Sequence, residues 1–338
     1  KGADYIHWEE KRKEYTNQTG NIRRGVGMSL FSYKTGVWPI SLEIAGARMT
    51  LNQDGSVGLM LGATEIGQGA DTVFSQMAAE VLNMDISDIH IQTVQDTDVT
   101  PFDTGAYASR QSFVTGTVVK DCANLLKKKI LDYAKELLPE ETRKLRLDHG
   151  WIMAGKDPAI SLGNLALESY YSLGNSSVIT AEVSEQVKKN TIATGCCFAE
   201  VEVDIKLGKI KILHVHDSGK LINPKLAEMQ VQGGMSMGMG YGLSEQLILD
   251  EKTGRPLNGT LLDYKLMTMM DTPDIKADFV ELDDPIGPFG NKALGEPPAI
   301  PGAPAIRNAV LHATGVAFNE NPLTPQRLID GFIKARLI

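Results

Sequence analysis

The stretch FAEVEVDIKLGKIKILHVHD, residues 198–217, limits the possible folds more than any other part of the chain. Val201, Val203 and Ile205 alternate with acidic residues, which is the period of a strand with one buried face. A turn at Leu207–Gly208 makes this stretch an antiparallel hairpin. A second hairpin is expected at 44–63, where the turn NQDG joins IAGARMTL to SVGLMLGA.

Amphipathic segments outside the hairpins predict helices. Phe74, Met77 and Val81 recur at helical spacing after the second hairpin. Further helices are expected at 113–138, at 162–170, at 223–242 and from the capping pair Thr324–Pro325 onward. Hairpins with segregated helices indicate an α+β fold of two mixed lobes, and not a doubly wound α/β sheet.

Length, charge and cysteine content narrow the class of protein. A chain of 338 residues is long enough for two domains, which we place at 22–190 and 191–338 after an N-terminal extension at 1–21. The net charge of −8 and the absence of a dense basic run argue against a nucleic-acid partner. No apolar run reaches the roughly 18 to 20 residues of a membrane span. Three cysteines without a CxxC pair fit a reducing cytoplasm and exclude an iron–sulfur cluster ligated within this chain.

Two glycine-rich or small-residue turns each precede a helix. In TEIGQGADT, residues 64–72, backbone N–H groups are expected to point outward unpaired and to favour an anion. Thr72 stands where a dinucleotide fingerprint needs its third glycine, so a tight structural turn is the alternative. DTGAYASRQS, residues 103–112, repeats this pattern. Two such turns in one domain suggest a large ligand with several phosphate or oxo groups.

Glycines also recur at four-residue intervals in the helix expected at 223–242. Gly234, Gly238 and Gly242 would lie on one helix face and allow a close approach to the backbone. Either a neighbouring element of the chain or a ligand could make that approach.

One acidic residue stands alone in the stiff, apolar stretch NKALGEPPAIPGAPAIRNAV. Glu296 lies between Gly295 and Pro297, so little steric bulk precedes it and a rigid backbone follows. Such a mounting suits a general base that meets one substrate atom in one geometry, and burial among apolar neighbours would raise the pKa of a glutamate. The alternative is a carboxylate that caps the helix starting near Pro304.

Taken in order, four stretches resemble signatures of one family: GATEIGQGADTVFSQMAAEVL, DTGAYASRQSFVTG, HDSGKLINPKLAEMQVQGGMSMGMGYGLSE and NKALGEPPAIPGAPAIRNAV. The family is that of the molybdenum-binding subunit of xanthine dehydrogenase, aldehyde oxidase and carbon monoxide dehydrogenase. The resemblance covers the C-terminal half of such a subunit. Its size is similar to the smaller molybdopterin subunit of nicotinate dehydrogenase.

The resemblance implies a role for each matching residue. Glu296 matches the general base beside the molybdenum, which the pterin dithiolene holds without a direct protein ligand. Gln68 matches the residue that hydrogen-bonds a molybdenum oxygen. The cofactor cradle would comprise Gly67, Gln68, Gly69, Gly105, Ala106, Tyr107, Ala108, Ser109, Asn223, Gly234, Met237 and Gly238.

Some positions depart from the family pattern or concern the substrate. Tyr107 stands where many members have a serine, and Met237 where some have a glutamine, so the pterin contacts or the cofactor tail could differ. Phe31, Tyr33 and Trp38 are candidates for stacking on a substrate ring, with ordinary aromatic packing as the alternative.

By this resemblance, the chain is part of an oxidoreductase that hydroxylates a ring carbon of an aromatic N-heterocycle such as nicotinate, with water as the oxygen source. Oxidation of xanthine, another purine or an aldehyde is the alternative, and a non-catalytic assembly subunit is an alternative of another class. The cofactor would be molybdenum-molybdopterin in its cytosine dinucleotide form. The implied partners are a larger molybdopterin subunit with the N-terminal half, an iron–sulfur subunit with [2Fe-2S] clusters and an FAD subunit.

Overall fold

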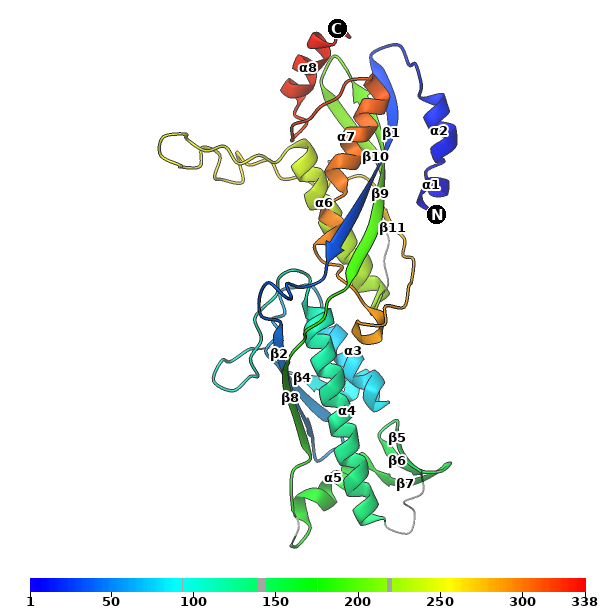
Figure 1. Cartoon of the computed structure of the whole chain (residues 1–338), viewed down its shortest axis with the longest axis vertical. Coiled ribbons are helices and arrows are strands. Elements are labelled where there is room, and N and C mark those ends of the chain that lie inside the picture. The colour runs from blue at the N-terminus through cyan, green and yellow to red at the C-terminus, as the bar shows by residue number, and fades with distance from the viewer. Residues whose placement is uncertain (93, 139–143, 175, 218–220) are drawn as a thin grey trace. The chain divides into compact units, whose positions relative to one another are not determined.

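The structure, a computed structural model, describes residues 1–92, 94–138, 144–174, 176–217 and 221–338, and residues 211–217 by their backbone alone (Figure 1). The chain forms two compact units that interleave along the sequence. Unit 1 comprises Lys1–Tyr33, Ile192–Leu282 and Leu294–Ile338, and unit 2 comprises Lys34–Thr191 and Asp283–Ala293. Each unit is described by itself. The assignment of separate pterin-binding domains to 22–190 and 191–338 stays a prediction.

Unit 1 is built on a four-stranded sheet in the order β1-β9-β10-β11. The strands are β1 (Ile22–Lys34), β9 (Ile192–Asp204), β10 (Lys209–Asp217) and β11 (Ile275–Ala277). β9 and β10 pair antiparallel, which confirms the hairpin expected at 198–217. The helices of its C-terminal part are α6 (Pro224–Leu243), α7 (Gly302–Thr314) and α8 (Pro325–Lys334).

The two faces of β9 bury different helices. Val201 and Val203 lie in a fully buried core with Val231 of α6 and Ile306 of α7. Phe198, on the other face, packs with residues of the N-terminal segment. In Figure 1, α6 and α7 accordingly flank one side of β9 while α1 (Gly2–Tyr5) and α2 (Trp8–Glu14) flank the other.

Residues 1–21, expected as an extension, are packed against unit 1. Ile6 and Tyr15 are buried against Val26 and Phe198. The Glu200 carboxylate accepts hydrogen bonds from Tyr15 Oη at 2.7 Å and from Lys11 Nζ at 2.6 Å. Burial, and then the bond to Glu200, raise the pKa of Tyr15 to about 12. The segment is therefore tied to the sheet by a buried polar anchor.

Unit 2 contains a four-stranded sheet in the order β4-β3-β2-β8 and a three-stranded sheet in the order β5-β6-β7. The strands are β2 (Ile44–Leu51), β3 (Val57–Leu61), β4 (Ile89–Ile91), β5 (Leu145–Asp148), β6 (Trp151–Ala154), β7 (Asp157–Ser161) and β8 (Thr180–Gln186). The helices are α3 (Ala70–Leu82), α4 (Gln111–Leu137) and α5 (Leu162–Tyr171). α4 packs against α3, β2 and β8. The second predicted hairpin is confirmed as β2–β3, and the α+β class is confirmed.

An irregular arm, residues 244–274, leaves the end of α6 and returns to β11 (Figure 1). Its own hydrogen bonds hold its shape: Asn258 accepts from Ile248 N at 2.8 Å, and Tyr264 Oη donates to Glu245 at 3.0 Å. Several of its large apolar side chains are nevertheless exposed, among them Leu261, Leu262, Met269 and Met270. In the described ranges no helix combines the length and apolar character that crossing a membrane requires.

Candidate functional site

Glu296 follows Gly295 in unit 1 and precedes a single 3-10 turn, Pro297–Ala299. Its side chain makes no capping hydrogen bond there, and Pro301 is the N-cap residue of α7. The capping alternative is therefore wrong. Instead, Glu296 Oε2 accepts a hydrogen bond from the hydroxyl of Tyr33, at the end of β1. Glu296 is exposed in this chain, so the expectation of burial among apolar neighbours is not met.

The glycines of α6 hold the backbone that carries Glu296. A Cβ added at Gly234 would lie 2.9 Å from Pro298 Cβ, and one at Gly238 would lie 2.5 Å from the carbonyl oxygen of Ala299. Distances this short exclude a side chain at either position. Of the two alternatives for this glycine series, the structure shows the approach of a neighbouring element. Gly234 and Gly238 thus act on Glu296 indirectly, because they pack against the turn that follows it.

A different face of α6 is open. Gly233 has no atom within 4 Å of an added Cβ, and Met237, one turn further, is 68% exposed. Met229 and Tyr241 on the same face are exposed as well. At the start of the helix, Asn223 is the N-cap and accepts from Leu226 N at 3.0 Å. Met237 therefore lies where a ligand or partner can reach it, whereas the Asn223 side chain caps the N-terminus of α6.

In unit 2, the glycine-rich turn before α3 is filled by the chain itself. The Glu65 carboxylate accepts from Gly67 N at 2.7 Å, Gly69 N at 3.1 Å and Asp71 N at 3.0 Å. Burial by itself would raise the pKa of Glu65, but these backbone donors outweigh it and lower the pKa. The expectation of outward, unpaired N–H groups at Gly67 and Gly69 is wrong, because an internal carboxylate occupies the position of the anion.

Gln68, in the same turn, is held at both ends of its amide. Its Nε2 donates to Thr64 O at 2.9 Å and to Gln111 Oε1 at 2.7 Å, and its Oε1 accepts from Ile66 N at 2.7 Å. Gln111 in turn donates to Thr64 O at 3.0 Å. Gln68 could donate to a bound group only by exchanging one of these bonds.

The small-residue loop before α4 is fixed from below by a buried arginine. Arg110 is fully buried and donates to Glu43 Oε2 and to Asp103 Oδ1, both at 2.6 Å. It also donates to the carbonyl oxygens of Ile44 at 2.8 Å and Gly105 at 3.0 Å. Arg110 was not among the predicted site residues. The sequence signal that could have pointed to it is a single basic residue inside a loop of small residues.

The backbone of this loop has an uncommon conformation. Ala108 and Ser109 both have φ of 48°, a left-handed conformation that few non-glycine residues adopt. Ala106 and Tyr107 are exposed, and Tyr107 Oη donates to Thr104 Oγ1 at 2.9 Å. The loop thus presents its backbone at the surface of unit 2 while Arg110 holds it in place.

Comparison with known proteins identifies the family of the chain. The sequence model of the family described as "Molybdopterin cofactor-binding domain" matches residues 1–273, most of the chain. The chain belongs to this family. It is 49% identical to the putative xanthine dehydrogenase molybdenum-binding subunit XdhA of Escherichia coli over 100% of this chain and 46% of that protein. It is 31% identical to the probable hypoxanthine oxidase XdhD of Escherichia coli over 98% of this chain and 34% of that protein.

A solved structure shares the fold. Quinoline 2-oxidoreductase from Pseudomonas putida 86 superimposes with a TM-score of 0.88 at 24% identity, over 98% of this chain and 45% of that one. The chain therefore spans about half the length, or less, of the relatives that it matches.

Only part of the predicted cradle in this molybdopterin cofactor-binding domain is suited to a pterin. Asn291 Oδ1 in unit 2 is buried without a partner in the described part of the chain, while Asn291 Nδ2 donates to Ser112 O at 2.8 Å. An unsatisfied buried acceptor near the start of α4 and the exposed backbone at Ala106 suit a polar ligand. The filled turn at Gly67–Gly69 does not. Within unit 2, the fit therefore lies with the loop before α4 and Asn291.

The three aromatic candidates have different environments. Phe31 is buried in unit 1, which supports ordinary packing. Trp38 is half-buried in unit 2, and its carbonyl accepts from Asn190 Nδ2 at 2.8 Å. Tyr33 donates a hydrogen bond to another predicted site residue, Glu296.

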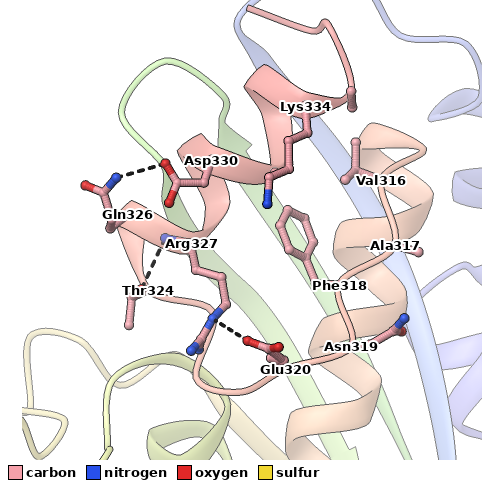
Figure 2. Close-up of a pocket in the computed structure, with 12 residues that line it drawn as sticks. Val316, Ala317, Phe318, Asn319, Glu320, Thr324, Gln326, Arg327, Asp330 and Lys334 are labelled. Carbon is pink, nitrogen blue, oxygen red and sulfur yellow. Dashed lines mark hydrogen bonds and ion pairs between the residues drawn. The ribbon is translucent and has the colours of Figure 1, made fainter.

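A separate pocket of about 740 Å³ lies in unit 1 between α8 and the loop that precedes it (Figure 2). Several polar side chains of its lining pair with one another: Arg327 forms an ion pair with Glu320 at 3.6 Å, and Gln326 donates to Asp330 at 2.9 Å. None of the predicted site residues lines it. We assign no chemistry to this pocket.

Proposed function

We propose that this chain is the base-bearing part of a molybdenum hydroxylase that oxidises an oxopurine of the xanthine or hypoxanthine type. The observation that carries the proposal is Glu296, an acidic side chain on a rigid turn whose Oε2 receives the Tyr33 hydroxyl. Family membership and the names of its relatives support the substrate class. Nicotinate and aldehydes are weaker alternatives, because the relative at 49% identity is named for xanthine.

In this proposal Glu296 takes up a proton on its carboxylate, and the Tyr33 hydroxyl donates a hydrogen bond to Oε2 of that carboxylate. The Gly234–Pro298 and Gly238–Ala299 contacts keep the backbone of that base in place. When bound, the molybdenum cofactor would supply the oxygen-transfer and two-electron chemistry. In unit 2, the loop Gly105–Ser109 and Asn291 would contact it, and a cytosine dinucleotide would be its tail.

We also propose that the chain works with polypeptide corresponding to the rest of the relatives' subunit and with iron–sulfur and flavin partners. The match covers 46% of the XdhA subunit, so a comparable amount of protein is needed to complete the site. The arm at 244–274 supports this, because its exposed apolar side chains are typical of a surface that a partner covers. We propose that the remainder of the molybdenum subunit is the partner that covers this arm.

Metal and substrate analysis of the purified complex tests the proposal. We expect about one molybdenum per copy of this chain, and dye reduction that is faster with xanthine or hypoxanthine than with nicotinate or an aldehyde. Product oxygen should come from labelled water. Faster turnover of nicotinate would overturn the substrate class, and a complex without molybdenum would overturn the function.

A further inference from the structure

Tyr33 and Glu296 are joined through a rigid part of unit 1. β1, which ends with the Tyr33 region, lies beside β9 in the sheet and packs closely on α7. A Cβ added at Gly27 would lie 2.2 Å from the carbonyl oxygen of Ala305, so the strand and the helix backbone touch. Ser29 Oγ also donates to Pro301 O at 2.6 Å. The strand with Tyr33 and the segment with Glu296 are therefore held against each other before any ligand binds.

We propose that Tyr33 is a positioning residue for the base: its hydroxyl donates to Oε2 of Glu296 and so holds the carboxylate in one orientation. This inference rests on the proposed function. A donor to a carboxylate oxygen restricts the rotation of that side chain, and a general base needs a fixed geometry. Tyr33 is half-buried while Glu296 is exposed, so the tyrosine is the better ordered member of the pair.

The sequence gives Tyr33 another possible role, stacking on the substrate ring, and two substitutions separate the roles. Tyr33→Phe removes the hydroxyl and keeps the ring, whereas Tyr33→Leu removes both. A positioning residue predicts that both variants lose activity to the same extent with little change in KM. A stacking residue predicts that Tyr33→Phe resembles the wild type and that Tyr33→Leu raises KM.

The split between kcat and KM in the purified complex gives a readout that a merely structural role would not move. In Tyr33→Phe, kcat should fall about tenfold across the pH range in which the wild type is active, while KM and the molybdenum content stay the same. Tyr15→Phe is the matched control, since Tyr15 Oη also donates to a glutamate, Glu200, in unit 1. The control should keep the wild-type kcat. An unchanged kcat in Tyr33→Phe would overturn the inference.

A second readout does not depend on activity. Infrared difference spectra between the wild type and E296Q follow the carboxylate of Glu296. The same difference in a Tyr33→Phe background should show a shifted carboxylate stretching frequency, because the carboxylate loses a hydrogen bond, and identical frequencies would contradict the contact. If E296Q is inactive while Tyr33→Phe behaves as wild type, the inference fails and the function stands. If the complex lacks molybdenum, the function fails while the infrared comparison still tests the pair.

Discussion

Arg110 shows how a single residue can organise a loop that otherwise consists of small side chains. Its guanidinium is fully buried and is compensated by Glu43, Asp103 and two carbonyl oxygens. A buried charge with this many partners is costly to leave incomplete. The left-handed residues Ala108 and Ser109 are held within this frame.

Truncation of Arg110 should therefore destabilise the protein far more than truncation of an exposed arginine. We expect Arg110→Ala to lower the free energy of unfolding by about 3–5 kcal/mol, because two carboxylates lose their partner. Arg48→Ala is the control: Arg48 pairs with Glu182 at 2.9 Å, but its side chain is 40% exposed, so its loss should cost below about 1 kcal/mol. Urea denaturation compares them. Equal losses in the free energy of unfolding would show that the buried network around Arg110 contributes no more than the exposed pair at Arg48.

Individual residues also show what a sequence can and cannot predict. Glu296 was found because its stiff neighbours are adjacent in sequence. Its partner Tyr33 lies 263 positions away, and only the tertiary fold reveals the pair. The prediction for the turn at Gly67–Gly69 failed for a related reason. The glycines predict unpaired backbone N–H groups, but the sequence does not show that the Glu65 carboxylate folds back and accepts from them.

Among the elements, α6 combines two faces with opposite demands. Gly238 packs against Ala299, while Gly233 faces open space in this chain. The sequence alone does not distinguish the two glycines, because neither spacing nor composition predicts which of them packs against another element.

Alanine substitutions at these two glycines should have opposite signs. Gly233→Ala should raise the free energy of unfolding of this chain by about 0.5–1 kcal/mol, since alanine is the better helix former. Gly238→Ala should lower it by roughly 1–3 kcal/mol, because the added Cβ would lie 2.5 Å from a carbonyl oxygen. Thermal and urea unfolding measure both. If the two variants shift stability in the same direction, the packing account of α6 is wrong.

Long or strongly patterned elements were predictable and short or amphiphilic ones were not. The hairpin at β9–β10 and the helix α4 follow from period and length. The sheet β5-β6-β7 was missed because its strands have only four or five residues. The helices α1 and α2 were missed because they contain no buried residue, and the buried Ile6 and Tyr15 lie just outside them.

At the scale of the whole molecule, two interleaved units divide the predicted site. Glu296, Tyr33 and α6 belong to unit 1, while Gln68 and the loop Gly105–Ser109 belong to unit 2. The two predicted domains are each continuous in sequence, and such a division does not anticipate that β1 belongs to unit 1 with the C-terminal segments. The reason is that the pairing of β1 with β9 is non-local.

The exposed arm leads to a prediction for the assembled protein. Met269 and Met270 are 91% and 92% exposed, whereas Met235 is fully buried. With the chain alone, dilute peroxide should oxidise the two arm methionines many times faster than Met235. In the complex with the rest of the molybdenum subunit, we expect their oxidation to slow by about tenfold or more as a partner covers them. Peptide mass spectrometry reads the rates, and equal rates in both samples would remove the arm from the interface.

Replacement of Glu296 by glutamine tests the account most directly. Glutamine has nearly the same shape but cannot take up a proton, so E296Q in the complex should keep its molybdenum and pterin content. Its oxopurine turnover should fall by at least about a hundredfold at every pH. A variant that retains both its molybdenum and wild-type turnover would contradict the assignment of Glu296 as the base.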